Sequence, residues 1–278
     1  MDVPATFKEG SAFVKLNPQA ADVPDAWWTL FNDRVLNDLQ DRLLKGNQTL
    51  ASSAAAVGVA QAAVTSSRAS LFPAIGVSGG ASRTANVATS PKGTSYSVQG
   101  TLSSWEIDLW GRVAATVDAA DARYQASRHT FAATRLSLQA TLAQTYFSML
   151  AADALINVIE QTVTAYKSSL NLTQNRYQGG VASAADVAQA QTQLKSAQAQ
   201  LVEARLQRAQ LEHAIASLLG QAPATLTLSH WSAEHLPQVP QIPLQLPSIL
   251  LARRPDIAAA AAQVAAANAQ IGAADAAF

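Results

Sequence analysis

The chain has 278 residues, of which 49% are hydrophobic, 6% aromatic and 14% charged, so it can build a sizeable core but carries unusually few charges. Its 19 Lys and Arg balance its 19 Asp and Glu, which leaves no basic surplus for phosphate contacts, and no nucleic acid is expected as a partner. Cysteine is absent, which excludes disulfides and thiolate metal sites.

The first 24 residues read as an irregular arm, without the basic and apolar stretches of a secretory signal. A short amphipathic helix is predicted next, because apolar side chains recur at helical intervals until Gly46-Asn47 ends the pattern. These side chains are Trp28, Phe31, Leu36, Leu39 and Leu43.

A second helix is predicted over the alanine-rich segment from Thr49 to Leu71, where Pro73 stops it. No uninterrupted run of about 18 apolar residues occurs in the chain, so no transmembrane helix is expected.

The period of the pattern then changes to two, with apolar residues alternating with small polar ones in FPAIGVSGGASRTA and again in YSVQGTLSSWE. The turn-rich stretch NVATSPKGTS separates the two segments, so a β-hairpin is predicted at about residues 72–109. Strands of about 11 to 13 residues would be long enough to cross a membrane. A small soluble hairpin with one buried face remains the alternative.

A long helix is predicted over residues 111–178, which contain neither proline nor a further glycine after Gly111. It would be roughly 100 Å long, far beyond an ordinary globular helix, and so belongs in a coiled coil or a tubular assembly. Gly179-Gly180 suits its C-terminal cap, and Ser183 with Asp186 forms a capping-box pattern for a return helix over 184–219. The two helices are expected to be antiparallel.

Prolines recur between residues 220 and 254, which predicts an irregular connector before a last alanine-rich helix from Pro255. Placing Asp256 on Thr49, an offset of 256 − 49 = 207, aligns apolar positions of this helix with the earlier one and reveals a weak internal repeat. The chain stops where a second hairpin should start.

Five segments in this order resemble, over nearly the whole chain, the TolC-type outer-membrane efflux proteins, and more closely their drug-efflux lipoprotein branch. The segments are AWWTLFND, RASLFPAIGVSGG, SWEIDLWGRV, NRYQGGVASAADVAQAQTQL and LLARRPDIAAAAAQVAAANAQIGAADAAF. The resemblance implies a homotrimer with two repeats in each subunit, in which twelve strands close an outer-membrane β-barrel and twelve helices form a periplasmic tunnel.

The fold expected for this chain is therefore mainly α with a β-hairpin, comprising long antiparallel helical hairpins of an α-barrel and two strands of a transmembrane β-barrel. The expected parts are an arm and equatorial helix (1–48), the first repeat (49–219), an equatorial connector (220–254) and the start of a truncated second repeat (255–278). Members of this branch begin with a lipidated cysteine, which this sequence lacks, so it is expected to be a fragment without signal, anchor and second repeat.

The aromatic residues that flank the hairpin, Phe72, Trp105 and Trp110, are interpreted as a membrane-interface belt, where amphipathic rings are favoured. Glu106, Asp108 and Arg112 would then lie in water or pair locally. The alternative is that both tryptophans pack inside a soluble corner between hairpin and helix.

The resemblance places the turn between the two long helices at the periplasmic tip that meets an adaptor protein. The expected contact residues are Arg176, Gly179, Gly180, Val181, Ala182, Ser183 and Asp186. The glycines and Ser183 could instead serve only to end and start helices, so Arg176 discriminates best between the two interpretations.

Enzyme interpretations have little support. His230 and His235, with Glu234 between them, lack a further carboxylate and helical spacing for a metal site. GVSGG lacks the lysine of a phosphate-binding loop, and VSGGAS lacks the order of a nucleophile elbow. Neither a catalytic group nor a cofactor is expected.

The function expected from the resemblance is a passive outer-membrane conduit of a tripartite efflux pump, with a periplasmic extension, in a Gram-negative bacterium. Its expected partners are two further copies of the chain, a periplasmic adaptor, an inner-membrane transporter of the resistance-nodulation-division type, and outer-membrane lipid. The alternative is a soluble helical rod, or an α-helical pore-forming protein whose hairpin is a membrane-seeking tongue.

Overall fold

The computed structural model describes residues 25–84, 93–102, 105, 107–230 and 253–277. They form two compact units: the described residues within 1–52 and 133–251 make up the first, and those within 53–132 and 252–278 make up the second. The predicted N-terminal arm and most of the predicted connector lie outside the described residues.

The predicted amphipathic helix is in fact two elements, a 3-10 turn η1 (Trp27–Phe31) and helix α1 (Arg34–Gly46). Asn32 ends the first element in the left-handed conformation, with φ of 52°. Asp33 then caps α1 by accepting hydrogen bonds from the amides of Val35 and Leu36 at 2.8 and 3.0 Å. The single-helix prediction was wrong because the Asn-Asp pair both stops one helix and starts another.

The core of the first unit lies where α1 meets two long helices, α3 (Arg112–Gln178) and α4 (Ala184–Leu218). Leu36, Leu39 and Leu43 of α1 are fully buried, as the helical spacing predicted. The remaining members are Trp28, Leu142, Ala143, Tyr146, Met149, Leu150, Ile215, Ala216, Leu219 and Leu226. The last of these follows the short 3-10 turn η2 (Pro223–Thr225).

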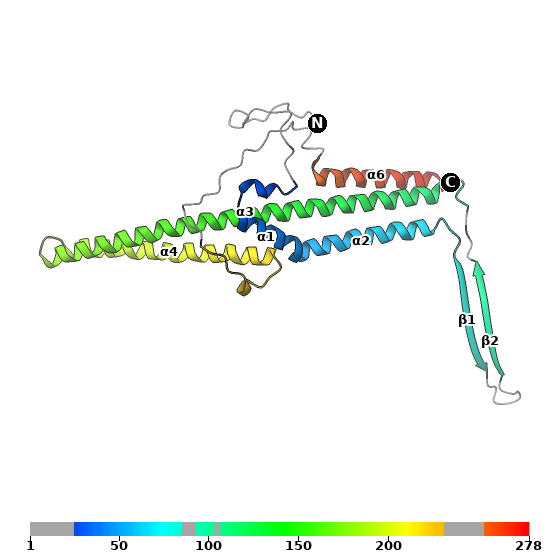
Figure 1. Ribbon diagram of the computed structural model, residues 1–278, viewed down its shortest axis with the longest axis horizontal. Coiled ribbons are helices and arrows are strands. Elements are labelled where there is room, and N and C mark those ends of the chain that lie inside the picture. The colour runs from blue at the N-terminus through cyan, green and yellow to red at the C-terminus, as the bar shows by residue number, and fades with distance from the viewer. Residues whose placement is uncertain (1–24, 85–92, 103–104, 106, 231–252, 278) are drawn as a thin grey trace, which may run out of the picture. The chain divides into compact units, whose positions relative to one another are not determined.

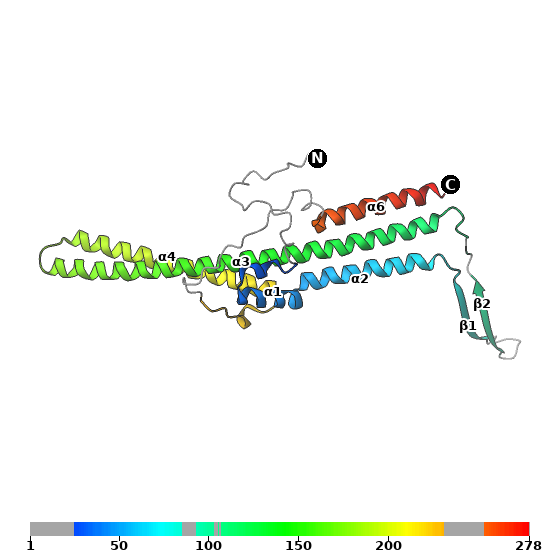
Figure 2. The ribbon, with the colours of Figure 1, turned by 45° about the horizontal axis from the view of Figure 1, so that its top comes forward.

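The long helices match the predicted ranges 111–178 and 184–219 to within one residue at each end. Within the first unit α3 and α4 lie side by side and antiparallel (Figures 1 and 2). An ion pair between Glu160 and Arg205, at 2.7 Å, joins them. Ala197 and Ala204 of α4 are buried seven residues apart, and such small side chains allow close helix packing.

The C-terminal ends of α1 and α4 approach each other closely at Gly46 and Gly220. A Cβ atom on Gly220 would overlap the carbonyl group of Gly46, and Gly220 also has a φ of 67°. The Asn47 side chain donates to the carbonyl of Leu218 at 2.7 Å beside this contact. Glycine is therefore required here on two counts.

The second unit contains most of α2 (Gln48–Ala69), a hairpin of β1 (Ile75–Thr84) and β2 (Gly93–Leu102), the start of α3, and α6 (Pro255–Asp275). Helix α2 ends two residues before the predicted Leu71. Its last turn tightens into i→i−3 bonds, from Ser70 to Ser67 and from Leu71 to Arg68, ahead of Pro73.

Helices α3 and α6 each contain an 18-residue stretch that is apolar enough, by length and composition alone, to cross a membrane. The sequence analysis expected no transmembrane helix, because it looked only for uninterrupted apolar runs. Abundant alanine, however, raises the mean hydropathy even of stretches that contain polar residues. Core helices of soluble proteins pass the same criterion, and 44% of the stretch in α3 is buried. Composition therefore does not assign either helix to a membrane.

The internal repeat is matched by the positions of the helices. Helix α2 begins at Gln48 and α6 at Pro255, a separation of 255 − 48 = 207 residues, which is the offset obtained from the sequence. A helix therefore starts at equivalent places in both segments, although Asn47 caps α2 with its side chain and α6 starts with Pro255 without a side-chain cap.

Candidate functional site

The hairpin has two chemically distinct faces, because opposite residues of an antiparallel pair point to the same side. One face pairs Ile75 with Leu102, Val77 with Gly100, Gly79 with Val98 and Ala81 with Tyr96. The other pairs Gly76 with Thr101, Ser78 with Gln99, Gly80 with Ser97 and Ser82 with Ser95. The register therefore confirms the predicted alternation on both strands; Figure 2 shows the two strands side by side.

The apolar face of the hairpin is almost fully exposed. Tyr96 is 81% and Val98 83% accessible, and Ile75, Val77 and Leu102 are similarly open. On the polar face the hydroxyls of Ser82 and Ser95 are 2.8 Å apart, and that of Thr101 donates to the carbonyl of Gly76 at 3.3 Å. A two-stranded hairpin with an uncovered apolar face is marginal in water, so this face requires an apolar environment.

Each strand has 10 residues, so the predicted hairpin of 72–109 with strands of 11 to 13 was too long. A strand of this length still meets the 9 to 11 residues, roughly, that a tilted membrane strand needs. The last described pair at this end of the hairpin joins Ile75 to Leu102. The described residues 105 and 107–111 belong to no helix or strand, and the amide of Leu109 donates to the carbonyl of Ile107 at 2.9 Å.

The aromatic residues of the predicted belt are exposed at the helical side of the hairpin. Trp110 is 82% accessible, Phe72 71% and Trp105 46%. Such exposure does not fit tryptophans packed inside a soluble corner. Glu106 lies outside the described residues.

Asp108, between the two tryptophans, binds the first turn of α3. Its carboxylate accepts a hydrogen bond from the amide of Ala114 at 2.8 Å. Backbone donors of this turn, Ala114 first, hold the pKa of the Asp108 carboxyl below its usual range. Sequence reasoning expected only local pairing here, because a capping residue normally lies directly before the helix rather than four positions earlier.

The seven residues that the sequence analysis assigned to the tip lie where α3 turns back into α4 (Figure 1). Arg176 belongs to the last turn of α3, Asp186 to the first turn of α4, and the other five form the turn between the helices. Gly180 has the left-handed φ of 74°, and the carbonyl of Arg176 accepts from the amide of Val181 at 2.8 Å, closing the helix as the two glycines predicted. Ala182 is half-buried, whereas the side chains of Arg176, Val181, Ser183 and Asp186 are exposed.

The predicted capping box is present at the start of α4. The Asp186 carboxylate accepts from the amide and hydroxyl of Ser183 at 2.8 and 2.7 Å, and the Ser183 hydroxyl accepts from the Asp186 amide at 3.2 Å. These donors, together with nearby Arg176, hold the pKa of the Asp186 carboxyl below its usual range. The tip backbone is thus fixed, while Val181 stays 70% exposed at its apex.

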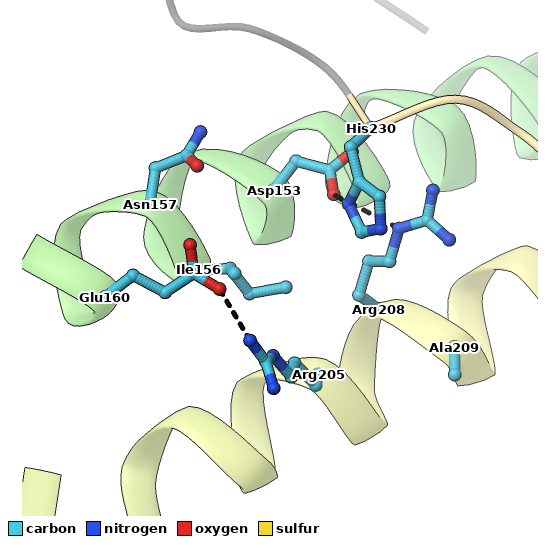
Figure 3. A pocket seen from close by; sticks show the side chains of 8 residues that line it. All are labelled: Asp153, Ile156, Asn157, Glu160, Arg205, Arg208, Ala209 and His230. Atoms are coloured by element: carbon cyan, nitrogen blue, oxygen red, sulfur yellow. Dashed lines mark hydrogen bonds and ion pairs between the residues drawn. The ribbon is translucent and has the colours of Figure 1, made fainter. Parts of the chain in front are cut away.

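A charged pocket of about 510 Å³ lies between α3 and α4 in the first unit (Figure 3). It is lined by Asp153, Ile156, Asn157, Glu160, Arg205, Arg208, Ala209 and His230. Sequence reasoning missed this cluster, because 55 residues separate Asp153 from Arg208 and no local pattern joins them. His230 binds Asp153 at 2.8 Å, while His235 and Glu234 of the weighed metal site lie outside the described residues. No group of three or more potential metal ligands occurs within the described ranges.

The chain is similar to known proteins over most of its length. A family model described as outer membrane efflux protein matches residues 39–221. The probable efflux pump outer membrane protein TtgC of Pseudomonas putida is 36% identical over 269 residues, which cover 93% of this chain and 54% of TtgC. The chain therefore spans about half the length of the curated relatives that it matches.

Solved structures give the same result. The outer-membrane channel OprN matches with a TM-score of 0.81 and 28% sequence identity, covering 99% of this chain and 62% of that chain. The Campylobacter jejuni outer membrane channel CmeC matches with a TM-score of 0.80, covering 100% of this chain and 61% of that chain. Its identity of 23% shows a likeness of fold alone.

Proposed function

Because the chain belongs to the outer membrane efflux protein family, we propose that it forms part of a subunit of an outer-membrane channel that conducts small molecules passively out of the periplasm. The subunit lies in the outer membrane with a periplasmic extension. Three subunits close the channel, a periplasmic adaptor binds it, and an inner-membrane transporter of the resistance-nodulation-division type supplies the energy. The chain itself acts as a conduit and catalyses no reaction.

The observation that carries this proposal is the exposed apolar face of the β1–β2 hairpin. Val98 and Tyr96 lie on this face, with opposite Gly79 and Ala81, while Gln99 lies on the polar face. In an outer-membrane barrel the apolar face of each strand meets lipid and the polar face meets water. The family match favours this arrangement over a soluble rod or an α-helical pore-forming protein.

The exposed aromatic belt and the helical tip fit the same proposal. Phe72, Trp105 and Trp110 flank the hairpin on one side, where a membrane-water interface would favour their rings. The tip from Arg176 to Asp186 is the proposed adaptor contact. Its hydrogen bonds fix the backbone, so that Val181 and the Arg176 side chain stay exposed for a partner.

Spin labels on neighbouring strand residues test the proposal. Val98→Cys and Gln99→Cys are introduced separately into the full-length protein in outer-membrane vesicles and labelled with a nitroxide. The 278 residues contain no cysteine, and the unsubstituted full-length protein, treated in the same way, gives the background labelling. We expect the label at 98 to collide mainly with oxygen, which dissolves in lipid, and the label at 99 mainly with a water-soluble nickel chelate. Equal nickel accessibility at both positions would contradict a membrane-spanning hairpin.

A further inference from the structure

Arg208 of α4 is a buried cation whose donors serve three acceptors; Figure 3 shows it beside one of them, Asp153 of α3. Its side chain is 8% exposed. The Nε atom donates to Asp153 on α3 at 3.1 Å, and Nη1 donates to Glu212, one turn along α4, at 2.6 Å. The third bond, from Nη2, goes to the backbone carbonyl of Leu228 at 2.7 Å.

The backbone of Leu228 is held from both sides by this arrangement. Its carbonyl accepts from Arg208, and its amide donates to the second carboxylate oxygen of Glu212 at 2.7 Å. Charged side chains thus make the two backbone bonds that a neighbouring strand would otherwise make. Leu226, two residues earlier, is buried in the core, and the Leu228 side chain is half-buried against it, so the segment 226–230 is docked by its backbone and by two apolar side chains.

A second attachment of this segment leads to α3. His230 lies 2.8 Å from the Asp153 carboxylate that also accepts from Arg208, and the Asp153 side chain is 1% exposed. The other charged groups that line the adjoining pocket, Glu160 and Arg205, pair with each other at 2.7 Å. The cation that joins Asp153, Glu212 and Leu228 is therefore Arg208.

The guanidinium serves the three acceptors in fixed directions, because it is planar and presents its donors in a rigid fork, whereas the three donors of a lysine ammonium rotate about one bond. That geometry requires Asp153 on α3 to stay level with Arg208 on α4. A slide of one helix past the other by one helical turn, about 5.4 Å, would take the carboxylate out of hydrogen-bond reach. Arg208 would then lose the bond that orients its plane toward Leu228.

We propose that Arg208 makes the docking of residues 226–230 conditional on the register between α3 and α4. This segment follows the end of α4 and η2, so a sliding movement of the long helices is transmitted to the chain that leaves them. This coupling between helix register and docking goes beyond the proposed conduit role and does not depend on it.

The amide of Leu228 reports directly whether the segment 226–230 is docked, because it donates to the Glu212 side chain and not to a helix carbonyl. Hydrogen exchange of this amide is measured in the full-length protein. Arg208→Lys retains the positive charge but not the planar fork. We expect it to accelerate exchange at Leu228 by at least about tenfold, the effect of losing one good hydrogen bond, while Ile215 in the core of α4 stays protected. Unchanged exchange at Leu228 would overturn the proposal.

A coupling measurement separates conditional docking from plain stabilisation. It is made in a His230→Ala background, which removes the direct bond between the segment and Asp153. There, Asp153→Asn should accelerate exchange at Leu228 several-fold, although Asp153 does not contact Leu228 in the structure. Adding Arg208→Lys should abolish the further effect of Asp153→Asn. Coupling through Arg208 is refuted by either of two results. One is that Asp153→Asn leaves exchange at Leu228 unchanged; the other is that Asp153→Asn accelerates this exchange equally whether residue 208 is Arg or Lys.

Glu212→Gln provides a milder perturbation if Arg208→Lys disrupts the fold, which loss of protection at Ile215 would reveal. It keeps an acceptor near the Leu228 amide but removes the charge that pairs with Arg208. Exchange at Leu228 should again accelerate with protection at Ile215 retained. Exchange like that of the wild type would overturn the proposal.

Discussion

Gly220 shows how much one position can constrain the first unit. Its positive φ disfavours any residue with a Cβ atom, and such an atom would also overlap the carbonyl group of Gly46. Gly58 in the middle of α2 is the opposite case, because an added Cβ would meet no atom within 4 Å.

Gly220→Ala is therefore expected to destabilise the full-length protein by more than about 1 kcal/mol, the cost of left-handed backbone for an L-residue. Gly58→Ala is the matched control and should be neutral or stabilising by up to about 1 kcal/mol, since alanine favours helix. Thermal unfolding of the two purified variants measures both effects. Equal melting temperatures would show that the contact with Gly46 relaxes at no cost.

Single residues also mark the limit of sequence reasoning. The Ser183–Asp186 cap and the closing glycines could be predicted because all their partners lie within a few positions. Asp108 could not, since it reaches Ala114 from an unusual distance before the helix. The role of Arg208 could not be predicted either, because it depends on a hydrogen bond to Asp153, which only the pairing of two helices brings near.

Among the elements, the long helices were predicted to within one residue and the hairpin less well. Helices α3 and α4 begin and end at local signals, namely the Gly-Arg step, the glycine pair and the capping box. Strand ends depend on where pairing stops, which no local pattern specifies, so the hairpin proved shorter than 72–109. The break at Asn32–Asp33 was missed because apolar periodicity continues across it.

The start of α4 should depend on pH through Asp186. Because the folded pKa of this carboxyl is lowered, its stabilisation of the cap is fully present above the unfolded pKa, about 3.9, and is lost as pH falls through the folded value. Hydrogen exchange of the amides of residues 184–187, corrected for intrinsic rates, should show more opening below about pH 4. Asp186→Asn should show weaker capping that no longer depends on pH over this range.

Ser183→Ala is the control for this prediction, since it removes the hydroxyl that exchanges hydrogen bonds with Asp186 but leaves the carboxylate in place. It should reduce the pH dependence without removing it, because the Ser183 amide still donates to the carboxylate. A pH response of Asp186→Asn equal to that of the wild type would show that another group controls the tip.

At the scale of the whole molecule, the internal repeat and the family match are two separate observations. The 207-residue separation of α2 and α6 shows two similar segments, and the chain spans about half of TtgC. The exposed face of the hairpin and the family match together point to a channel wall. Sequence alone reached this conclusion only through resemblance, because alternation of side chains fits soluble hairpins equally well.

Efflux in cells tests whether the protein is an outer-membrane conduit. A host whose own outer-membrane efflux channels are deleted, and which has the matching adaptor and transporter, receives the full-length gene, and its sensitivity to unrelated toxic compounds is measured. The wild type should restore resistance several-fold. Val98→Asp, which puts a charge on the apolar face, should not, because a charge facing lipid at this position costs free energy, whereas Gln99→Asp on the polar face should restore it. Failure of the wild type while it is present in the outer membrane, or full restoration by Val98→Asp, would contradict the account.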